Sequence, residues 1–264
     1  AGTFYTYEVT VAGETRETQD VYSKAVGVNG DRSMVVDLSA TNPEGWETDK
    51  GPRVKNQTDA IIYEVHIRDI SMDPNSGIQL KGTYKGFVEP GTKSAEGEAT
   101  GIDHLKEMGV THVHILPMYD FATVDETRMK DENYNKFNWG YDPKNYQVPE
   151  GSYSTDPYSG TLRIEEMKEM IKALHDAGIG VIMDSVYNHT YSLDDSCFTK
   201  TVPGYYYRQT ADGSVANTSG CGNDTASERS MFRKYMIDSV TYWAKEYHID
   251  GFRFDLMGIH DIET

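Results

Sequence analysis

The run Gly251-Phe252-Arg253-Phe254-Asp255, near the end of the chain, carries the residues best suited to chemistry. Arg253 and Asp255 are two positions apart, so on a strand their side chains point the same way. A guanidinium in that place keeps a carboxylate ionised through charge pairing and hydrogen bonds. An ionised, oriented carboxylate is what the nucleophile of a glycosidase must be. The alternative is a structural Arg–Asp pair that closes a strand end.

A second apolar run ends at Asp184 and is followed by Tyr187, Asn188 and His189. A neutral histidine at the end of a strand can hydrogen-bond a sugar hydroxyl. The same three loop residues could instead ligate a metal ion or satisfy loop backbone groups. The position of Asp184 at a strand terminus therefore indicates a site, and its chemistry stays open at this point.

The segment Phe137–Pro143 places Trp139 and Tyr141 on either side of Gly140. Glycine lets a backbone approach another group closely, and a tyrosine ring offers a flat apolar face with a hydroxyl at its edge. Tyr141 could stack under a sugar ring while Asp142 bonds sugar hydroxyls. A packed aromatic turn is the alternative.

A glycine-rich loop, Ser219–Arg229, opens the longest predicted helix. Asn223 in this loop could contact a ligand, although a nearby threonine or serine could serve only as the helix N-cap. Cys197 and Cys221 are too few for a tetrahedral structural zinc site. They predict either one disulfide or two free thiols, and we expect no metal ligands among the site residues.

The composition of the chain argues against some classes of binding partner. The 264 residues carry a net charge of −17, which argues against nucleic acid and anionic membranes, because phosphate binding needs clustered cations. No apolar run approaches the length of a membrane span. The 19 tyrosines suit sugar binding, but a tyrosine-rich core explains them more simply.

The predicted secondary structure that positions these residues differs between the first 58 residues and the rest of the chain. Residues 1–40 alternate as strands, with turns at Gly13 and Asn29-Gly30, and residues 41–58 read as a linker. Apolar runs then predict strands at 61–67, 111–117, 180–184 and 250–255. Apolar spacing predicts helices at 101–108, 164–177 and 228–247.

Four β-then-α units predict an α/β fold, either a (β/α)₈ barrel or a doubly wound sheet. Long loops, 118–160 and 185–226, follow the second and third strands, whereas the connections from helix to strand are short. Function in a barrel collects on the loops after the strands, where Asp184 and Asp255 lie. Open sheets use the same edge, but no glycine-rich phosphate loop follows any strand.

These motifs, taken in order, resemble the α-amylase family (glycoside hydrolase family 13), and in particular the type I pullulanases. Asp184–His189 is similar to the first conserved region of that family and Gly251–Asp255 to its second. The run "FNWGYDP" resembles the pullulanase signature, with Phe137 where that signature usually has tyrosine. "PEGSYSTDP", "VPGYYYR", "GCGNDTASER" and "FRFDLMGIHD" extend the similarity over residues 59–264.

The resemblance implies retaining hydrolysis of α-1,6-glucosidic branch links in pullulan, starch or glycogen dextrins. It makes Asp255 the nucleophile and Arg253 the residue that orients it. His189 and Tyr141 would hold the sugar whose bond is broken. The remaining residues expected to bind substrate or support this subsite are Trp139, Asp142, Asp184 and Asn223.

It also implies an architecture. Residues 51–264 would form the first half, about four β/α units, of a (β/α)₈ barrel. Residues 1–50, with "VNGDRSMVVDL" and "PEGWETDK", would be the last strands of a β-sandwich carbohydrate-binding module of family 48.

A retaining glycosidase needs a second carboxyl group about 5–5.5 Å from the nucleophile. In this family that glutamate follows the fifth strand, so we expect the remaining C-terminal half of the same protein to be a partner, and the chain alone to be inactive. The sequence indicates no cofactor with certainty. Calcium stays open, because Asn188 and nearby carboxylates offer oxygen ligands, although the chain has no EF-hand-like loop. A secreted or cell-surface bacterial location is expected, with the cytoplasm as the alternative.

Two other functions remain open from the sequence. An isoamylase or branching-enzyme relative would share the regions around Asp184 and Asp255. A non-catalytic α-glucan-binding protein would use the same half-barrel only as a platform for sugars.

Overall fold

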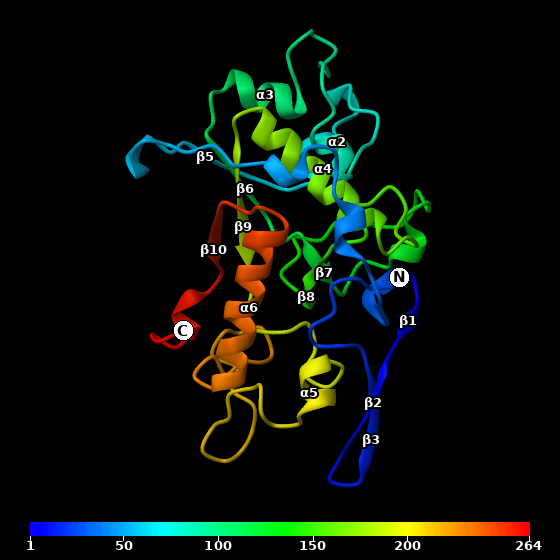
Figure 1. Ribbon diagram of the computed structural model, residues 1–264, viewed down its shortest axis with the longest axis vertical. Helices are drawn as coiled ribbons and strands as arrows, with labels where there is room; N and C mark the ends of the chain where they lie inside the picture. The colour runs from blue at the N-terminus through cyan, green and yellow to red at the C-terminus, as the bar shows by residue number, and fades with distance from the viewer.

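One four-stranded parallel sheet lies at the centre of the computed structural model, which describes residues 1–264 (Figure 1). Its strands, in spatial order, are β10 (Gly251–Phe254), β9 (Gly180–Ser185), β6 (His112–Ile115) and β5 (Ile62–Val65). All neighbouring pairs are parallel, and Arg253 is the register partner of Asp184. Every crossover between these strands contains helix, as parallel pairing requires. The predicted α/β fold is confirmed: it has four parallel strands, and the first three along the chain are each followed by helices.

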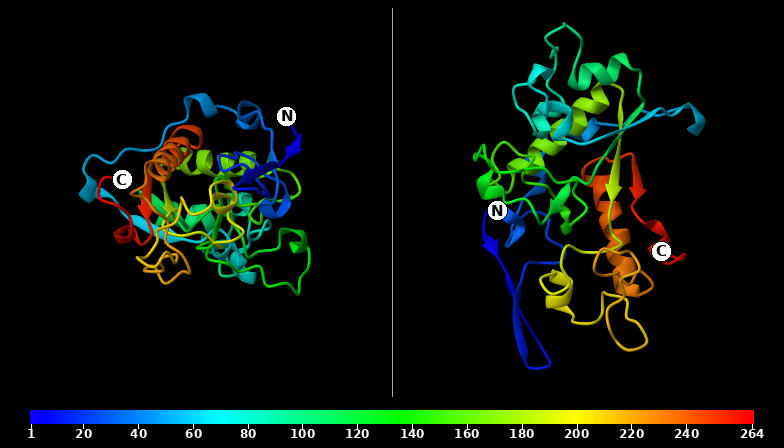
Figure 2. Two further views of the ribbon diagram at one scale, coloured as in Figure 1. Left: turned by 90° about the horizontal axis from the view of Figure 1, so that it is seen from below. Right: turned by 180° about the vertical axis from the view of Figure 1, so that it is seen from behind.

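Two long helices cover one face of this sheet. Figures 1 and 2 show α4 (Leu162–Asp176) and α6 (Ser230–Glu246) on the same side, while β9 and β10 are seen unobstructed from behind. The other helices are α1 (Asp69–Met72), α2 (Tyr84–Phe87), α3 (Gly101–Glu107) and α5 (Cys197–Thr201). The 3₁₀ turns are Val28–Gly30, Leu38–Thr41, Trp46–Thr48, Gln57–Asp59, Pro74–Ser76, Glu126–Arg128 and Met257–Ile259.

The strands alternate between a packed face and an open face. Val113, Val181 and Met183 are fully buried in the core. Because successive side chains on a strand point to opposite faces, the residues between them, such as His114 and Asp184, lie on the face without helices. In a barrel this open face is the interior, so the fold directs the polar residues toward a barrel axis.

The predicted loop 118–160 contains regular structure that the sequence did not indicate. Here β7 (Tyr119–Phe121) pairs antiparallel with β8 (Pro143–Pro149), with irregular register. Prolines at both ends of β8 argue against a strand from sequence. The pairing is held by burial, since Tyr119, Phe121, Tyr146 and Val148 are all in the interior.

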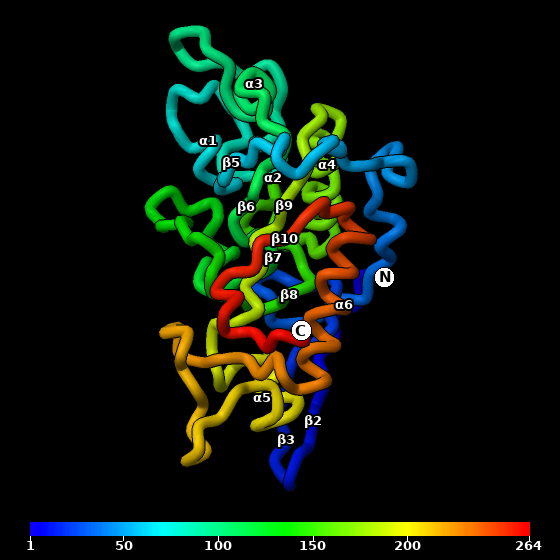
Figure 3. Tube along the Cα trace, turned by 90° about the vertical axis from the view of Figure 1, so that its left-hand side faces the viewer, coloured from blue at the N-terminus to red at the C-terminus, as the bar shows by residue number.

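The N-terminal 50 residues form two small antiparallel pairs. Strand β1 (Phe4–Tyr5) pairs with β4 (Ser33–Met34), and β2 (Tyr7–Val11) forms a hairpin with β3 (Glu14–Thr18). Ala12 and Gly13 both have positive φ, as a two-residue type I′ hairpin turn requires. Figure 3 shows this hairpin extending away from the parallel sheet. The last of the strands predicted within residues 1–40 ends at residue 34. The assignment of residues 1–50 to a β-sandwich module stays a prediction.

Many of the tyrosines belong to the core. Eight of the 19 are buried: Tyr84, Tyr119, Tyr146, Tyr153, Tyr187, Tyr207, Tyr235 and Tyr247. Five more pack against the core while partly buried: Tyr63, Tyr134, Tyr141, Tyr206 and Tyr242. Several of these rings contact one another, as do Tyr146 and Tyr187 with centroids 5.2 Å apart. Core packing therefore accounts for most of the tyrosine content. No helix combines the length and the apolar composition needed to cross a membrane.

A cluster of histidines and aspartates ties the linker to the end of the sheet opposite the candidate site. Asp49 Oδ2 lies 2.8 Å from Nδ1 of both His175 and His248. His175 Nε2 lies 3.0 Å from Asp250 Oδ2, and Asp250 also accepts the backbone N–H of Val181. Burial lowers the pKa of His175, but hydrogen bonds to Asp250 and Asp49 outweigh burial and raise this pKa above its usual value.

The cluster predicts a pH-dependent contribution to stability. Because the folded-state pKa of His175 is raised, its contribution is complete below the unfolded pKa of about 6.5 and is lost as pH rises through the folded pKa. His175→Gln should lower the free energy of unfolding by about 1.5–3 kcal/mol at pH 5.5 and by less at pH 9. Denaturant unfolding of both proteins at the two pH values measures this difference; an equal loss at both would contradict it.

Candidate active site

The predicted carboxylates and arginine meet at the carboxyl-terminal edge of the sheet. Arg253 Nη1 donates to Asp184 Oδ1 at 2.9 Å and Oδ2 at 3.1 Å, and to Asp255 Oδ1 at 2.9 Å. The Asp184 side chain is fully buried, whereas 15% of the Asp255 side chain is exposed. The parallel register of β9 and β10 produces this arrangement, because it places Arg253 directly beside Asp184. One carboxylate is structural and the other faces solvent.

Asp184 is the centre of a hydrogen-bond network. Besides Arg253, it accepts from Tyr141 Oη at 2.8 Å and lies 3.1 Å from His114 Nε2. Burial, reinforced by the hydrogen bond to Asp184, raises the pKa of Tyr141, so this hydroxyl stays protonated. Desolvation lowers the pKa of Arg253, but its bonds to Asp184 outweigh this and keep the guanidinium charged. Asp184 therefore holds both the Tyr141 ring and the Arg253 guanidinium in place, and its role in supporting a sugar subsite stays a prediction.

Asp255 is held from two directions. Asn188 Nδ2 donates to its Oδ2 at 3.0 Å and to its backbone oxygen at 2.9 Å, while Arg253 holds Oδ1. The next residue, Leu256, has a φ of 43°, which a branched side chain adopts at a cost. The turn after the strand is thus constrained, and each carboxylate oxygen of Asp255 has a donor.

His189 lies beside this carboxylate. Its Nε2 is 2.8 Å from the backbone oxygen of Tyr141, and its Nδ1 contacts Asn188 Oδ1. Burial lowers the pKa of His189, so the ring is neutral at neutral pH, as a sugar-binding histidine would be. Both ring nitrogens face protein oxygens, but a neutral ring carries one N–H and donates to only one of them. A sugar hydroxyl would bond Nε2 in place of the Tyr141 backbone oxygen.

A solvent-open hollow of about 570 Å³ lies next to Asp255. Its lining is Glu64, Leu116, Trp139, Tyr141, His189, Cys221, Asp255 and Leu256. Trp139 is 60% exposed and presents a free ring. Gly140, between Trp139 and Tyr141, has a φ of 88°, and a Cβ there would lie 2.7 Å from the backbone oxygen of Pro117. Glycine is therefore required for the aromatic segment to lie at this edge.

Two predicted substrate contacts lie elsewhere. Asn223 is only 2% exposed, and its side-chain amide bonds the backbone of Thr190 at both ends. The amide closes the loop in this structure, and the ligand contact of Asn223 stays a prediction. Asp142 accepts from Thr123 and Asn138 and does not line the hollow, so its geometry is that of a residue that holds the aromatic segment in place.

The sequence did not single out Glu64 and His114. Glu64 Oε2 lies 3.4 Å from His114 Nδ1, and His114 reaches Asp184, so a chain of polar contacts crosses the open face. The available indication was their alternation with buried residues on β5 and β6, which puts them on the face of Asp184. Leu116 and Cys221 were also not assigned to the hollow. Cys197 and Cys221 are free thiols, buried and exposed respectively.

His114 provides a test of this network. Replacement by phenylalanine removes one of the donors to the buried Asp184 carboxylate and should destabilise the fold by about 1–3 kcal/mol. His112→Phe is the matched control, because His112 lies on the same face of β6 and its side chain bonds only Thr111. Urea unfolding of both variants measures the effect, and an equal loss in both would show that the bond to Asp184 contributes nothing.

A second acidic group lies away from the hollow. Asp120, Glu126 and Glu150 are buried, and oxygen atoms of all three lie within 4.8 Å of one another. Carboxylate oxygens in that number could hold a cation. Arg163, fully buried, already pairs with Glu126 at 2.9 Å and with Asp120 at 3.4 Å. Burial raises the pKa of Asp120 to about 7, and that of Glu150 also rises.

The fold and the site together are those of part of a parallel β/α barrel domain, with a partly exposed carboxylate at the carboxyl-terminal edge of its sheet. Residues 83–212 match the family described as alpha amylase, catalytic domain. The chain is 46% identical over 251 residues to the pullulanase of Bacillus subtilis (strain 168), covering 95% of this chain and 34% of that protein.

Solved structures of pullulanases are also similar to this chain. The crystal structure of the Paenibacillus barengoltzii pullulanase in complex with maltohexaose and alpha-cyclodextrin superposes with a TM-score of 0.96 at 53% identity, over 98% of this chain and 40% of that one. The pullulanase from Bacillus acidopullulyticus gives a TM-score of 0.93 at 50% identity, over 98% of this chain and 31% of that one. The chain belongs to the α-amylase family of glycoside hydrolases, among its type I pullulanases, and spans roughly a third of the length of these relatives.

Proposed function

We propose that this chain supplies the nucleophile side of an active site that hydrolyses α-1,6-glucosidic links in branched α-glucans, with retention of configuration. The observation that carries the proposal is the Asp255 carboxylate, held by Arg253 and Asn188 at the edge of an open hollow. Retaining hydrolysis requires such a carboxylate, ionised and oriented toward the anomeric carbon. The complexes of a relative with maltohexaose and alpha-cyclodextrin support an α-glucan as the ligand.

In the proposed reaction Asp255 attacks the anomeric carbon and forms a glycosyl-enzyme, while the leaving sugar oxygen takes a proton from an acid. Water then cleaves the intermediate with the same group acting as base. Arg253 and Asn188 hold the two carboxylate oxygens of the nucleophile in a fixed orientation. Tyr141 and Trp139 would pack against the sugar rings, and His189 would bond a hydroxyl.

The acid is not supplied by the residues described here. The only other carboxyl group lining the hollow belongs to Glu64 on β5. Three strand spacings separate β5 from β10, which puts the two carboxyl groups on the order of 14 Å apart along the sheet. A retaining pair needs about 5–5.5 Å. We therefore propose that the remaining strands of a longer polypeptide provide the acid and close the sheet edges at β5 and β10.

The test compares two proteins on pullulan. The 264-residue chain alone should release no maltotriose, whereas a polypeptide that adds the C-terminal strands should do so at the rate of an ordinary enzyme. Turnover by the chain alone would contradict the need for an external acid. If the polypeptide with the C-terminal strands does not hydrolyse pullulan but acts on other α-glucans, the result would favour an isoamylase-like or branching-enzyme-like specificity.

A non-catalytic α-glucan-binding role is the second candidate, favoured by one observation: the carboxyl group that shares Arg253 with Asp255 is that of Asp184, which is fully buried and does not line the hollow, so no free acid lies next to Asp255. The two functions predict different results for the completed protein. Binding of maltotriose without any hydrolysis of pullulan or branched dextrins would establish the binding role.

For the buried acidic group, we propose that Arg163 acts as its counter-cation and that calcium is not needed there. Three carboxylates would suit calcium by ligand type, but Arg163 already makes ion pairs with two of them, Asp120 and Glu126. Thermal unfolding with EDTA or with millimolar calcium should give the same midpoint. An increase of several degrees with calcium would contradict the proposal.

A further inference from the structure

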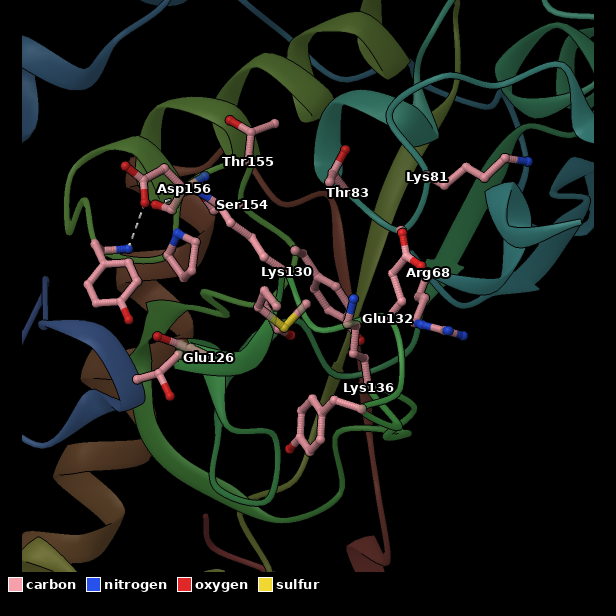
Figure 4. Close-up of a pocket in the computed structure, with 18 of the residues that line it drawn as sticks. Arg68, Lys81, Thr83, Glu126, Lys130, Glu132, Lys136, Ser154, Thr155 and Asp156 are labelled. Atoms are coloured by element: carbon pink, nitrogen blue, oxygen red, sulfur yellow. Dashed lines mark hydrogen bonds between the residues drawn. The ribbon is translucent and has the colours of Figure 1, made fainter. Parts of the chain in front are cut away.

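A separate pocket of about 520 Å³ opens beside the candidate active site, within the range of small-molecule sites (Figure 4). Three segments form it: the connection from β5 to α2, the loop 126–136, and residues 152–158. Figure 4 shows Glu132 and Lys136 across the space from Ser154 and Thr155. The pocket shares no lining residue with the hollow at Asp255.

Several polar groups in this pocket have no partner in the chain. The Ser152 hydroxyl, the exposed ammonium group of Lys130 and the exposed carboxylate of Glu132 make no hydrogen bond or ion pair within the chain. The Ser152 hydroxyl is accessible from the pocket although the residue as a whole is only 4% exposed, so it is open to a ligand or to water. These groups are donors and acceptors on facing walls of one pocket.

The charges of the pocket select among ligands. Four cations line it, but Lys81 is bonded by the backbone oxygens of Ser71 and Asp73 and by the Ser76 hydroxyl. Glu132 and Asp156 put negative charge on both sides of the remaining cations. A phosphate or carboxylate ligand would meet these acids, whereas a neutral polyhydroxyl ligand can use donors and acceptors of either sign. The lining therefore fits a sugar better than an anion.

One aromatic face in the pocket is free. Tyr158 is 60% exposed and its hydroxyl has no partner. Tyr134, in contrast, is covered by the guanidinium of Arg128 at 4.3 Å from its ring centre. An exposed tyrosine ring beside unpaired polar groups gives a sugar both an apolar surface and hydrogen bonds.

The pocket is connected to the candidate active site through its floor. Tyr153 Oη lies 3.0 Å from His66 Nε2, and that nitrogen is 2.8 Å from the backbone oxygen of Asn138. Asn138 precedes Trp139, which lines the hollow. Lys136, in the same segment, lines the pocket. The segment 136–141 is thus a wall between two neighbouring spaces.

We infer that this pocket is a second α-glucan site, which holds another segment of the branched polymer while the hollow holds the segment to be cut. The inference rests on the proposed function for the choice of an α-glucan. Two linked sites on one polymer raise its apparent affinity well above that of a short ligand, because the second contact is intramolecular. The pocket should therefore matter most for long, branched glucans.

The test is calorimetric titration of the full chain with maltotriose and with a branched limit dextrin. Tyr158→Ala should weaken dextrin binding about tenfold and remove one of two maltotriose sites, while Trp139→Ala removes the other. Tyr7→Ala is the control, since Tyr7 is exposed on the N-terminal hairpin and should change neither ligand. Circular dichroism confirms that the variants fold.

Each outcome decides between the two proposals. Unchanged dextrin binding in Tyr158→Ala overturns the second site even if Trp139→Ala lowers affinity, and leaves the proposed function standing. Loss of binding to inorganic phosphate, but not to maltotriose, in Lys130→Ala would overturn it in favour of an anion site. If neither sugar binds the wild-type chain at millimolar concentration, both the second site and the sugar assignment of the hollow fail.

Discussion

Replacing Asp255 with asparagine, in a polypeptide that carries the remaining barrel strands, is expected to lower kcat on pullulan about 10⁴-fold or more. An amide cannot form the glycosyl-enzyme, and removal of a nucleophile typically costs this much or more. Asparagine keeps the shape of the side chain and can still bond Arg253 or Asn188. The affinity for maltotriose should therefore change by less than about threefold, because the nucleophile acts mainly in the transition state.

The measurement pairs reducing-sugar release with calorimetric titration. Asp176→Asn is the control, since Asp176 is an exposed carboxylate at the end of α4 whose partner is Lys172. It should leave both hydrolysis and binding unchanged. A variant at Asp255 that retains hydrolysis would remove this residue from the mechanism, and one that loses binding and hydrolysis together would point to a positioning role instead.

The second large effect is expected at Arg163. Its replacement by methionine keeps much of the side-chain volume but leaves Asp120 and Glu126 buried without their cation. Breaking a buried ion pair by removing one partner costs about 3–5 kcal/mol. Because the pKa of Asp120 is already raised by burial, the variant should be least stable at high pH, where its carboxyl groups must ionise.

The sign follows from linkage. A carboxyl group whose folded-state pKa lies above its unfolded value of about 3.9 destabilises the fold progressively as pH rises toward the folded pKa. Urea unfolding of Arg163→Met at pH 5 and pH 8 should show the larger loss at pH 8. Arg128→Met is the matched control: its partner Asp131 is exposed, so the loss should stay below about 1 kcal/mol. Similar losses in both variants would contradict the argument.

Much of this fold could be read from local patterns. Predicted helices at 164–177 and 228–247 correspond to α4 and α6 within two residues, because their apolar residues recur at helical spacing. The four parallel strands were visible as short apolar runs. The antiparallel pair β7–β8 was not, since Pro143 and Pro149 flank a strand whose pairing comes from burial against distant residues.

Part of the candidate site could also be predicted from local sequence patterns, and part could not. The i, i+2 spacing of Arg253 and Asp255 alone placed both on one face, and the resemblance to the α-amylase family supplied their roles. The sequence could not show that Asn223 closes a loop or that His114 reaches Asp184. Both contacts join residues far apart along the chain, 33 and 70 positions respectively.

What the sequence by itself determined is the set of strands, their polar ends and the alternation that directs Asp184, Arg253 and Asp255 to one face, because periodicity is a local property of the backbone. Only the tertiary structure decided which groups form hydrogen bonds and ion pairs with one another. The parallel register brings Arg253 between two carboxylates, and burial makes one of them structural while the other stays exposed. Hydrogen bonds and desolvation depend on distance in space, and no spacing along the chain encodes that distance.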